Sequence, residues 1–324
     1  MKKRISLALA AALLAGICVG FCGCGAENGK KTDGISVVAT VFPAYDWVRA
    51  VVGETDTVEL TMLLDDGVDL HSFQPSADDV VRIAGCDLFL YVGGESDGWV
   101  EDTLGEGGKD SRIVLDLIEL LGDAAKTEEA VEGMEAEEDG EDGEEAEYDE
   151  HVWLSLKNAG FFVEKIRDAL SELDKANAET YAANAEAYLQ ELSALDREFV
   201  SAIGQASRKT LLFGDRFPFR YLADDYGLTY YAAFPGCSAE SEASFETVLF
   251  LAKKVDELAL PVVLTTEGSD GRIAQTVIGA TEGKNAEVLA MDSMQSTTAK
   301  DVKNGKTYLS AMKQNLEVLK KALR

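Results

Sequence analysis

A stretch of about fifty residues, 158–207, divides this 324-residue chain and constrains its fold more than any other feature. It contains no proline, and its two glycines lie near its ends. Apolar side chains recur in it at spacings of three and four, which is typical of an amphipathic helix. They are Phe162, Ile166, Leu170 and Leu173, then Tyr181, Tyr188, Leu192, Leu195 and Phe199. The pattern predicts helix throughout, with a break near 173–177, and about 30 unbroken helical residues would extend roughly 45 Å.

On both sides of this stretch, short β-branched runs alternate with helical segments. Strands that are connected through helices form mostly parallel sheets with both faces covered. The expected strands are 36–42, 57–64, 87–92, 112–115, 210–214, 229–234, 261–266 and 286–291. The expected helices are 45–53, 76–86, 242–257, 270–281 and 305–323. We therefore expect an α/β fold with two similar lobes, 36–157 and 208–324, connected by the helical segment 158–207.

The first residues are typical of an exported chain. Three basic residues precede an apolar run, 5–21, which is shorter than the about 20 residues of a membrane-spanning helix. The run is followed by Phe-Cys-Gly-Cys, which resembles a bacterial lipobox with Cys24 as the lipidated residue. We expect a signal peptide at 1–24 and a polar tether at 25–35. The alternatives are a secreted protein without lipid and an uncleaved anchor.

Cysteine use agrees with an exported protein that needs no disulfides. Three of the five cysteines lie in the leader, which leaves Cys86 and Cys237 far apart in the body. Cys86 lies in an apolar run, so we expect it to be a small buried side chain. Cys237 lies in a loop rich in Gly, Ser and Glu, where a functional role is more plausible.

The charge of the chain favours cations as partners. The formal net charge is −29, and residues 128–150, within an expected loop at 123–150, hold 14 acidic side chains and no basic one. Such a chain repels nucleic-acid phosphates and anionic membrane surfaces. Two interpretations of the acidic tract stay open: a disordered, solubilising loop, or a weak collector of divalent cations.

The chain has only two histidines, His71 and His151. Each follows a loop and precedes or begins an element, which is where α/β proteins place ligands. A single loop histidine is more often a solvated or capping residue. In an exported chain that attracts cations, however, imidazole and carboxylate together suit a divalent transition metal such as zinc or manganese.

Five segments along the mature chain are distinctive: VVATVFPAYDWVRAVVG, GVDLHSFQP, DEHVWLSLKNA, AESEAS and LAMDSMQS. Together they resemble the metal-binding lipoproteins of bacterial ABC transporters for zinc and manganese, the cluster A-I or family 9 solute-binding proteins. The first is similar to the opening strand and helix of that family, and the second matches its Gly-Val-Asp-x-His-x-x-x-Pro pattern. The third resembles its Asp-Pro-His-x-Trp-Leu segment, and the last two resemble two further segments.

This resemblance implies two α/β lobes joined by one long, rigid helix, with a metal ion held between the lobes. It implies that His71 and His151 are ligands, since they stand at the two matched histidines. It also implies Asp292, because LAMDSMQS is similar to the segment that supplies an aspartate ligand from the C-terminal lobe. Asp149 or Glu150 would orient His151.

The third ligand position departs from the family pattern. Zinc-type members have a His-Asp-Ala-Phe-x-Tyr segment there, whereas this chain has FGDRFPFRYLADDYGL, without histidine. Manganese-type members can use a glutamate, and we expect Asp215 to substitute because it falls at a strand end. An ion pair of Asp215 with Arg216 or Arg220 is the alternative. The other candidates for the third ligand are Glu267, Glu242 and Cys237, and a cysteine would favour zinc.

The resemblance implies a receptor rather than an enzyme. We expect an extracytoplasmic, lipid-anchored protein that captures a divalent metal, zinc in the first place and manganese or iron as the alternative. It would deliver the metal to a membrane permease powered by a separate ATPase, since this chain has no nucleotide-binding glycine loop. The rivals are an adhesin of the same fold, a receptor for an organic solute, and a secreted metal-dependent hydrolase, for which the chain lacks an HExxH motif.

Overall fold

The computed structural model describes residues 34–105, 109, 111–135, 147–238 and 242–324. Residues Ile35–Arg324 form one compact unit. The expected signal peptide and the expected lipidation site at Cys24 lie outside the described residues. Within the described ranges, no helix combines the length and the apolar character that crossing a membrane requires.

The N-terminal lobe is built on a four-stranded parallel sheet with the strand order β2-β1-β3-β4. The strands are β1 (Ile35–Ala39), β2 (Val58–Met62), β3 (Leu88–Tyr91) and β4 (Ile113–Asp116). The helices are α2 (Phe42–Val52), α3 (Ala77–Gly85), α4 (Trp99–Gly105) and α5 (Leu117–Leu121), with 3-10 turns at η1 (Leu70–Ser72), η2 (Gly122–Ala124) and η3 (Val152–Leu154). Proline in the first turn of α2 needs no amide partner, and Gly53 ends α2 with a φ of 62°, which favours glycine.

The C-terminal lobe repeats this arrangement with the strand order β6-β5-β7-β8, again parallel throughout. Its strands are β5 (Thr210–Arg216), β6 (Thr229–Phe234), β7 (Val262–Thr266) and β8 (Glu287–Met291). Its helices are α8 (Arg220–Tyr226), α9 (Phe245–Glu257), α10 (Arg272–Ala280), α11 (Ala299–Lys303) and α12 (Tyr308–Ala322). The prediction of an α/β fold with two similar, parallel-sheet lobes is therefore confirmed.

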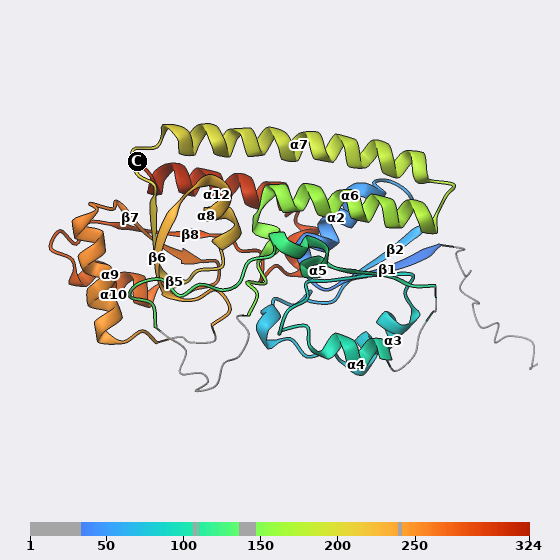
Figure 1. Ribbon diagram of the computed structural model, residues 1–324, viewed down its shortest axis with the longest axis horizontal. Helices are drawn as coiled ribbons and strands as arrows, with labels where there is room; N and C mark the ends of the chain where they lie inside the picture. The colour runs from blue at the N-terminus through green and yellow to red at the C-terminus, as the bar shows by residue number, and fades with distance from the viewer. Residues whose placement is uncertain (1–33, 106–108, 110, 136–146, 239–241) are drawn as a thin grey trace, which may run out of the picture. The chain divides into compact units, whose positions relative to one another are not determined.

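The connecting segment consists of two helices, α6 (Leu156–Leu173) and α7 (Ala178–Gln205), and the predicted break lies between them. The carboxylate of Asp174 accepts hydrogen bonds from the side-chain amide of Asn177 (2.7 Å) and the Tyr181 hydroxyl (3.0 Å), which stabilises the turn. Helix α7 then packs along α6 and contacts α2 of the first lobe as well as α8 and α12 of the second (Figure 1). It is the long helix that joins the lobes.

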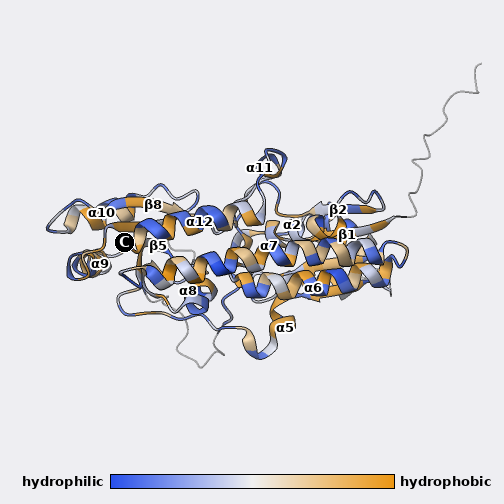
Figure 2. Cartoon of the chain, turned by 90° about the horizontal axis from the view of Figure 1, so that it is seen from above, coloured by the Kyte–Doolittle hydropathy of each residue, from blue (hydrophilic) through white to orange (hydrophobic). Residues whose placement is uncertain are grey.

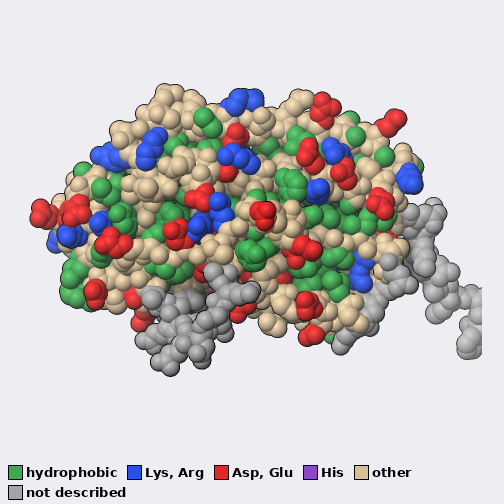
Figure 3. Space-filling view, in the orientation of Figure 1, with side chains coloured by type: hydrophobic (Ala, Val, Ile, Leu, Met, Phe, Trp, Pro, Cys, Tyr) green, Lys and Arg blue, Asp and Glu red, His purple; other side chains and the backbone are tan. Residues whose placement is uncertain are grey.

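Apolar and polar residues alternate along helices α6, α7 and α12 (Figure 2). Their apolar stripes face the core, where the ring of Trp47 packs against those of Phe162 and Tyr308, and all three are fully buried. On the face in Figure 3, acidic and basic side chains are interspersed, and no histidine of the described residues is visible. The two histidines lie inside instead, beside the carboxyl ends of the strands.

Candidate metal centre

His71 is held by a short turn that follows strand β2. Asp69 stands at the start of the 3-10 turn η1, and its side chain accepts a hydrogen bond from the His71 amide (3.1 Å). The imidazole Nδ1 of His71 lies 2.8 Å from the hydroxyl of Ser96 and 3.3 Å from the carboxylate of Glu150. With Nδ1 donating to these oxygens, the lone pair of Nε2 is available to a cation.

His151 is fully buried and is oriented from both its backbone and its ring. The carboxylate of Asp149 accepts from the His151 amide and from its Nδ1, at 2.9 Å in each case. Trp153 packs against the imidazole with its ring edge-on, at a centroid distance of 5.5 Å. Here too the Nδ1 bond leaves the Nε2 lone pair for a metal ion.

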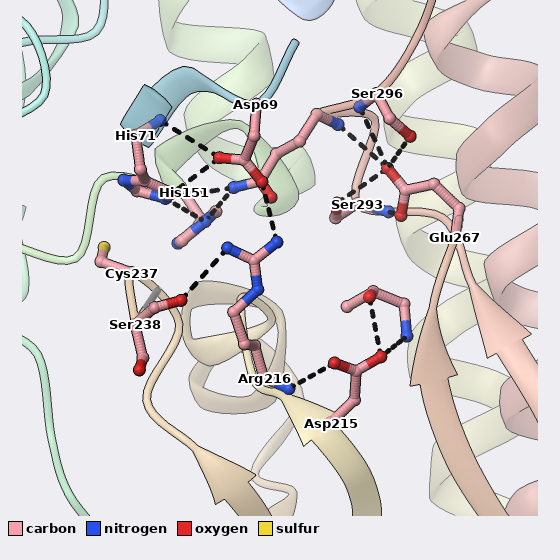
Figure 4. Close-up of polar contacts among 12 residues, drawn as sticks. Asp69, His71, His151, Asp215, Arg216, Cys237, Ser238, Glu267, Ser293 and Ser296 are labelled. Carbon is pink, nitrogen blue, oxygen red and sulfur yellow. Dashed lines mark hydrogen bonds and ion pairs between the residues drawn. The ribbon is translucent and has the colours of Figure 1, made fainter. Parts of the chain in front are cut away.

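The two Nε2 atoms converge at a separation of 3.5 Å (Figure 4). Two nitrogen ligands placed about 2.0–2.1 Å from a tetrahedral zinc ion lie about 3.4 Å apart, so this spacing fits zinc. The amide nitrogen of Gln295 lies against both Nε2 atoms, at 3.4 Å from that of His71 and in a short contact with that of His151. A cation bound by both histidines would take the place of this amide group.

The surroundings favour positive charge on His71. Burial lowers the pKa of His71, but the hydrogen bond and charge of Glu150, together with Asp69, outweigh burial and hold this pKa above its usual value. Burial raises the pKa of Glu150, but its bonds to His71 and Ser96 outweigh that effect and lower the pKa. A site that stabilises an imidazolium also stabilises a metal cation in the same place.

Among the described residues, the metal-ligating side chains that gather in a group of three are His71, His151 and Cys237, whose ligand atoms all lie within 4.8 Å of one another. Cys237 lies in the loop after β6, and Figure 4 shows its sulfur directed toward the imidazoles. Burial raises the pKa of its thiol, and the charges of Asp149, Glu128 and Glu150 raise it further. The sequence alone favours Asp215 as the third ligand and offers this cysteine as an alternative.

Asp215 is not part of that group. Its carboxylate accepts hydrogen bonds from the Thr266 amide (3.0 Å), the Thr266 hydroxyl (2.9 Å) and the Arg216 amide (2.8 Å). The next residue, Arg216, extends to the histidine side of the cleft and forms an ion pair with Asp69 at 2.8 Å (Figure 4). If Phe219 is matched to the Phe of the His-Asp-Ala-Phe-x-Tyr pattern, Arg216 rather than Asp215 stands where the family has histidine. A ligand role for Asp215 stays a prediction and would require its bonds to β7 to break.

Asp292 also uses its carboxylate elsewhere. One oxygen accepts from the Met294 amide (2.9 Å), and the other forms an ion pair with Lys306 (2.7 Å). Glu267, which follows β7, accepts from the amide (2.6 Å) and hydroxyl (2.9 Å) of Ser293 and from the amide of Gln295 (3.0 Å). Glu267 therefore holds the loop in the conformation that places Gln295 against the histidines. A ligand role for Asp292 stays a prediction.

A cleft of about 820 Å³ opens beside this group, between the two lobes. Its lining includes Asp69 and Ser72 from the first lobe, and Asp215, Arg216, Glu242 and Glu267 from the second. Glu242 is exposed there. The cleft is rich in carboxylates, which agrees with the preference for cations inferred from the sequence.

The first part of the expected loop 123–150 packs against the C-terminal lobe. The Lys126 amide donates to the Tyr221 hydroxyl (2.9 Å), and the Glu135 amide donates to the Ala233 carbonyl (2.9 Å). The carboxylate of Glu128, the first residue of the acidic tract, accepts from the Cys237 amide at 2.6 Å. These residues of the loop are thus part of the framework around Cys237, whereas residues 136–146 lie outside the described residues.

Asp97 holds the turn that follows β3, and its buried carboxyl group leads us to expect that stability depends on pH. It is buried and accepts from the Val92 (2.8 Å) and Gly93 (3.1 Å) amides, and burial, with the charge of Glu150, raises its pKa to about 7. The unfolded chain releases this proton near pH ~4. The contribution of Asp97 to the free energy of unfolding therefore falls by about 1.4 kcal/mol per pH unit between about pH 4 and about pH 7.

Asp97→Asn removes this titration and keeps an acceptor oxygen. We expect urea unfolding at about pH 5 and about pH 7 to show that the wild type loses stability relative to the variant by about 1.4 kcal/mol per unit. A stability difference that does not change with pH would contradict the shifted pKa of Asp97.

The chain is similar to a family and to individual proteins that are named for zinc binding or zinc uptake. The family described as zinc-uptake complex component A, periplasmic, matches residues 37–322. The zinc-binding lipoprotein AdcA of Streptococcus pneumoniae is 33% identical over 319 residues, which cover 98% of this chain and 60% of AdcA. The high-affinity zinc uptake system protein ZnuA of Bacillus subtilis is 30% identical over 311 residues, 94% of this chain and 93% of ZnuA. The chain therefore spans 60% of the length of the pneumococcal relative.

Solved structures show the same fold. The Zn(II)-bound ZnuA-like domain of Streptococcus pneumoniae AdcA aligns with a TM-score of 0.69 at 29% identity, over 90% of this chain and 99% of that domain. A mutant of the laminin-binding adhesin Lmb of Streptococcus agalactiae aligns with a TM-score of 0.72 at 26% identity, over 90% and 100% of the two chains. Both share the two-lobe architecture described above.

Proposed function

Because the chain belongs to the family of zinc-uptake complex component A, we propose that it is the zinc-binding receptor of an ABC importer. The observation that carries this proposal is the pair of pre-oriented imidazoles, His151 buried and His71 half-buried, whose Nε2 atoms lie 3.5 Å apart. Zinc is the cargo and not a catalytic cofactor, so the protein acts as a receptor and not as an enzyme. His71 and His151 hold the ion between the lobes, and Asp149 and Glu150 fix the rings.

The partners and the location follow from this function. The leader and Cys24 support an extracytoplasmic protein that a lipid holds at the cell membrane, and one relative is named a lipoprotein. Once loaded, the lobes would dock on a membrane permease whose separate ATPase drives release. Helix α7 packs on both lobes, so we expect small lobe movements on loading rather than a wide hinge closure.

Metal analysis of the purified protein tests this proposal. We expect one equivalent of bound zinc that excess Mn²⁺ does not displace, and we expect His71→Ala to lose that zinc. Gln74→Ala is the matched control, because Gln74 is exposed in the same loop and has no contact with the imidazoles in the described structure. Retention of manganese in preference to zinc would make the protein a manganese receptor. If neither form holds stoichiometric metal, the receptor is for another solute.

A further inference from the structure

We propose that the thiolate of Cys237 is the third zinc ligand, so that the cargo site consists of two imidazoles and one sulfur. This inference rests on the proposed zinc function and deepens it, because it names the residue that selects the metal. Cys237 comes from the C-terminal lobe, whereas His71 and His151 come from the N-terminal side. Zinc would therefore join the two lobes directly.

The geometry of the three ligand atoms is close to what zinc requires. A nitrogen at about 2.05 Å and a sulfur at about 2.3 Å from a tetrahedral zinc ion lie about 3.6 Å apart. The sulfur of Cys237 lies within 4.8 Å of one ring nitrogen of each histidine. A side-chain rotation or a shift of about 1 Å would bring it to the ligand distance, and changes of this size are common on binding.

The loop that carries Cys237 is built to approach the imidazole. The preceding residue, Gly236, lies so close to His151 that a Cβ atom there would come within 3.1 Å of the ring carbon Cε1 and 2.9 Å of the Phe217 carbonyl oxygen. Any other residue at this position would push the loop away from the ring. The Cys237 amide is anchored by Glu128 at 2.6 Å, so the acidic tract helps to position the thiol.

The other residues that could compete with Cys237 as the third ligand fit a metal less well. Arg216 stands where the family pattern has its third histidine, but a guanidinium stays protonated and has no lone pair for a metal. Both cysteines of the described chain are free, and each thiol has a hydrogen bond to the backbone: Cys86 to the Ile83 carbonyl inside the N-terminal lobe, and Cys237 to the backbone of Glu150, next to His151. Of the two, Cys237 is the one that lies beside both imidazoles, so it is placed to replace the missing histidine.

A sulfur ligand makes the site prefer zinc over manganese. Thiolate and imidazole together suit zinc, whereas manganese prefers oxygen ligands. On binding, the thiol releases its proton and forms the zinc–sulfur bond, while the imidazoles bind as neutral groups. The thiolate charge partly neutralises the cation inside the buried site, and Arg216 and the carboxylates around it keep their ion pairs.

The test compares Cys237→Ser with Cys86→Ser in the purified protein. We expect Cys237→Ser to lower zinc affinity about 100-fold or more while manganese affinity changes less than about tenfold, and we expect Cys86→Ser to change neither. Loading with Co²⁺ should produce a thiolate-to-metal charge-transfer band in wild type and Cys86→Ser, and that band should be absent in Cys237→Ser. Equal unfolding midpoints without metal would establish that the variants are folded.

A second measurement uses only the wild type, in case the variant does not fold. Saturating zinc should protect the Cys237 peptide from alkylation, as read by mass spectrometry, and chelation should restore the reaction. Equal alkylation with and without zinc, or Cys237→Ser with zinc affinity within about threefold of wild type, would overturn the thiolate ligand. A wild type that binds no zinc at all would instead overturn the proposed function, so the two failures are distinguishable.

Discussion

Zinc binding is expected to fall on the order of 1000-fold when His151 is replaced by alanine. Structural zinc sites contribute about 10–16 kcal/mol in total, so one of three or four ligands accounts for about 4 kcal/mol, or roughly a thousandfold in affinity. His151 is fully buried, and its ring is already oriented by Asp149 at 2.9 Å. The ligand is therefore pre-organised, and its removal leaves no third histidine to substitute, because His71 is the other histidine of the chain and is already at the site. Competition titration against a chelator of known affinity measures this loss.

Asp149→Asn is expected to weaken zinc binding less than His151→Ala does. It keeps the size of the side chain but weakens the acceptor for the His151 Nδ1–H, and removal of such an orienting partner typically costs about 10–100-fold in metal affinity. The expected order of affinity is wild type, then Asp149→Asn, then His151→Ala. If His151→Ala binds zinc as tightly as the wild type, the metal lies somewhere other than the pair of imidazoles.

The fold could be predicted in large part because its elements are long or strongly patterned. The helical stretch 158–207 and its break were predictable from apolar spacing alone, and the structure places the break at residues 174–177. The helices α4, α5, α8 and α11 were not predicted. Each has only five to seven residues, which is too short to repeat a helical period, so contacts with the rest of the chain determine them.

The sequence indicates the two histidines that the structure brings together, and it leaves the third ligand open for a physical reason. Neighbouring residues of a strand point to opposite sides, so a difference of one position decides which side chain faces the cleft. Asp215 turns toward Thr266 of β7, while Arg216 turns toward Asp69 and the histidines. No pattern in the sequence indicates which of these two neighbouring side chains faces the histidines at the end of β5. The approach of Cys237 depends on the loop after β6 and on Glu128, 109 residues earlier, and long-range contacts of this kind are invisible to local patterns.

The largest expected loss of stability comes from Trp153, which lies where the two lobes meet. Its side chain is fully buried, and its indole N–H donates to the Ser293 carbonyl of the β8–α11 loop at 2.8 Å. Its own carbonyl accepts from the hydroxyl of Tyr308, in α12, at 2.7 Å. We expect Trp153→Ala to lower the free energy of unfolding by about 3–5 kcal/mol, because it leaves a large cavity. Urea unfolding without metal gives this value directly.

Two further variants separate packing from hydrogen bonding at Trp153. Trp153→Phe keeps much of the ring volume but leaves the Ser293 carbonyl without its donor, so a loss of about 1–3 kcal/mol is expected. Phe245→Ala is the control: Phe245 is 78% exposed at the start of α9, and its removal should change stability by no more than about 0.5 kcal/mol. A free energy of unfolding that is lowest for Trp153→Ala, intermediate for Trp153→Phe and highest for the wild type would show that this side chain couples the segment carrying His151 to the C-terminal lobe. A loss under about 1 kcal/mol for Trp153→Ala would mean that the lobes are held together mainly by α7 and α12.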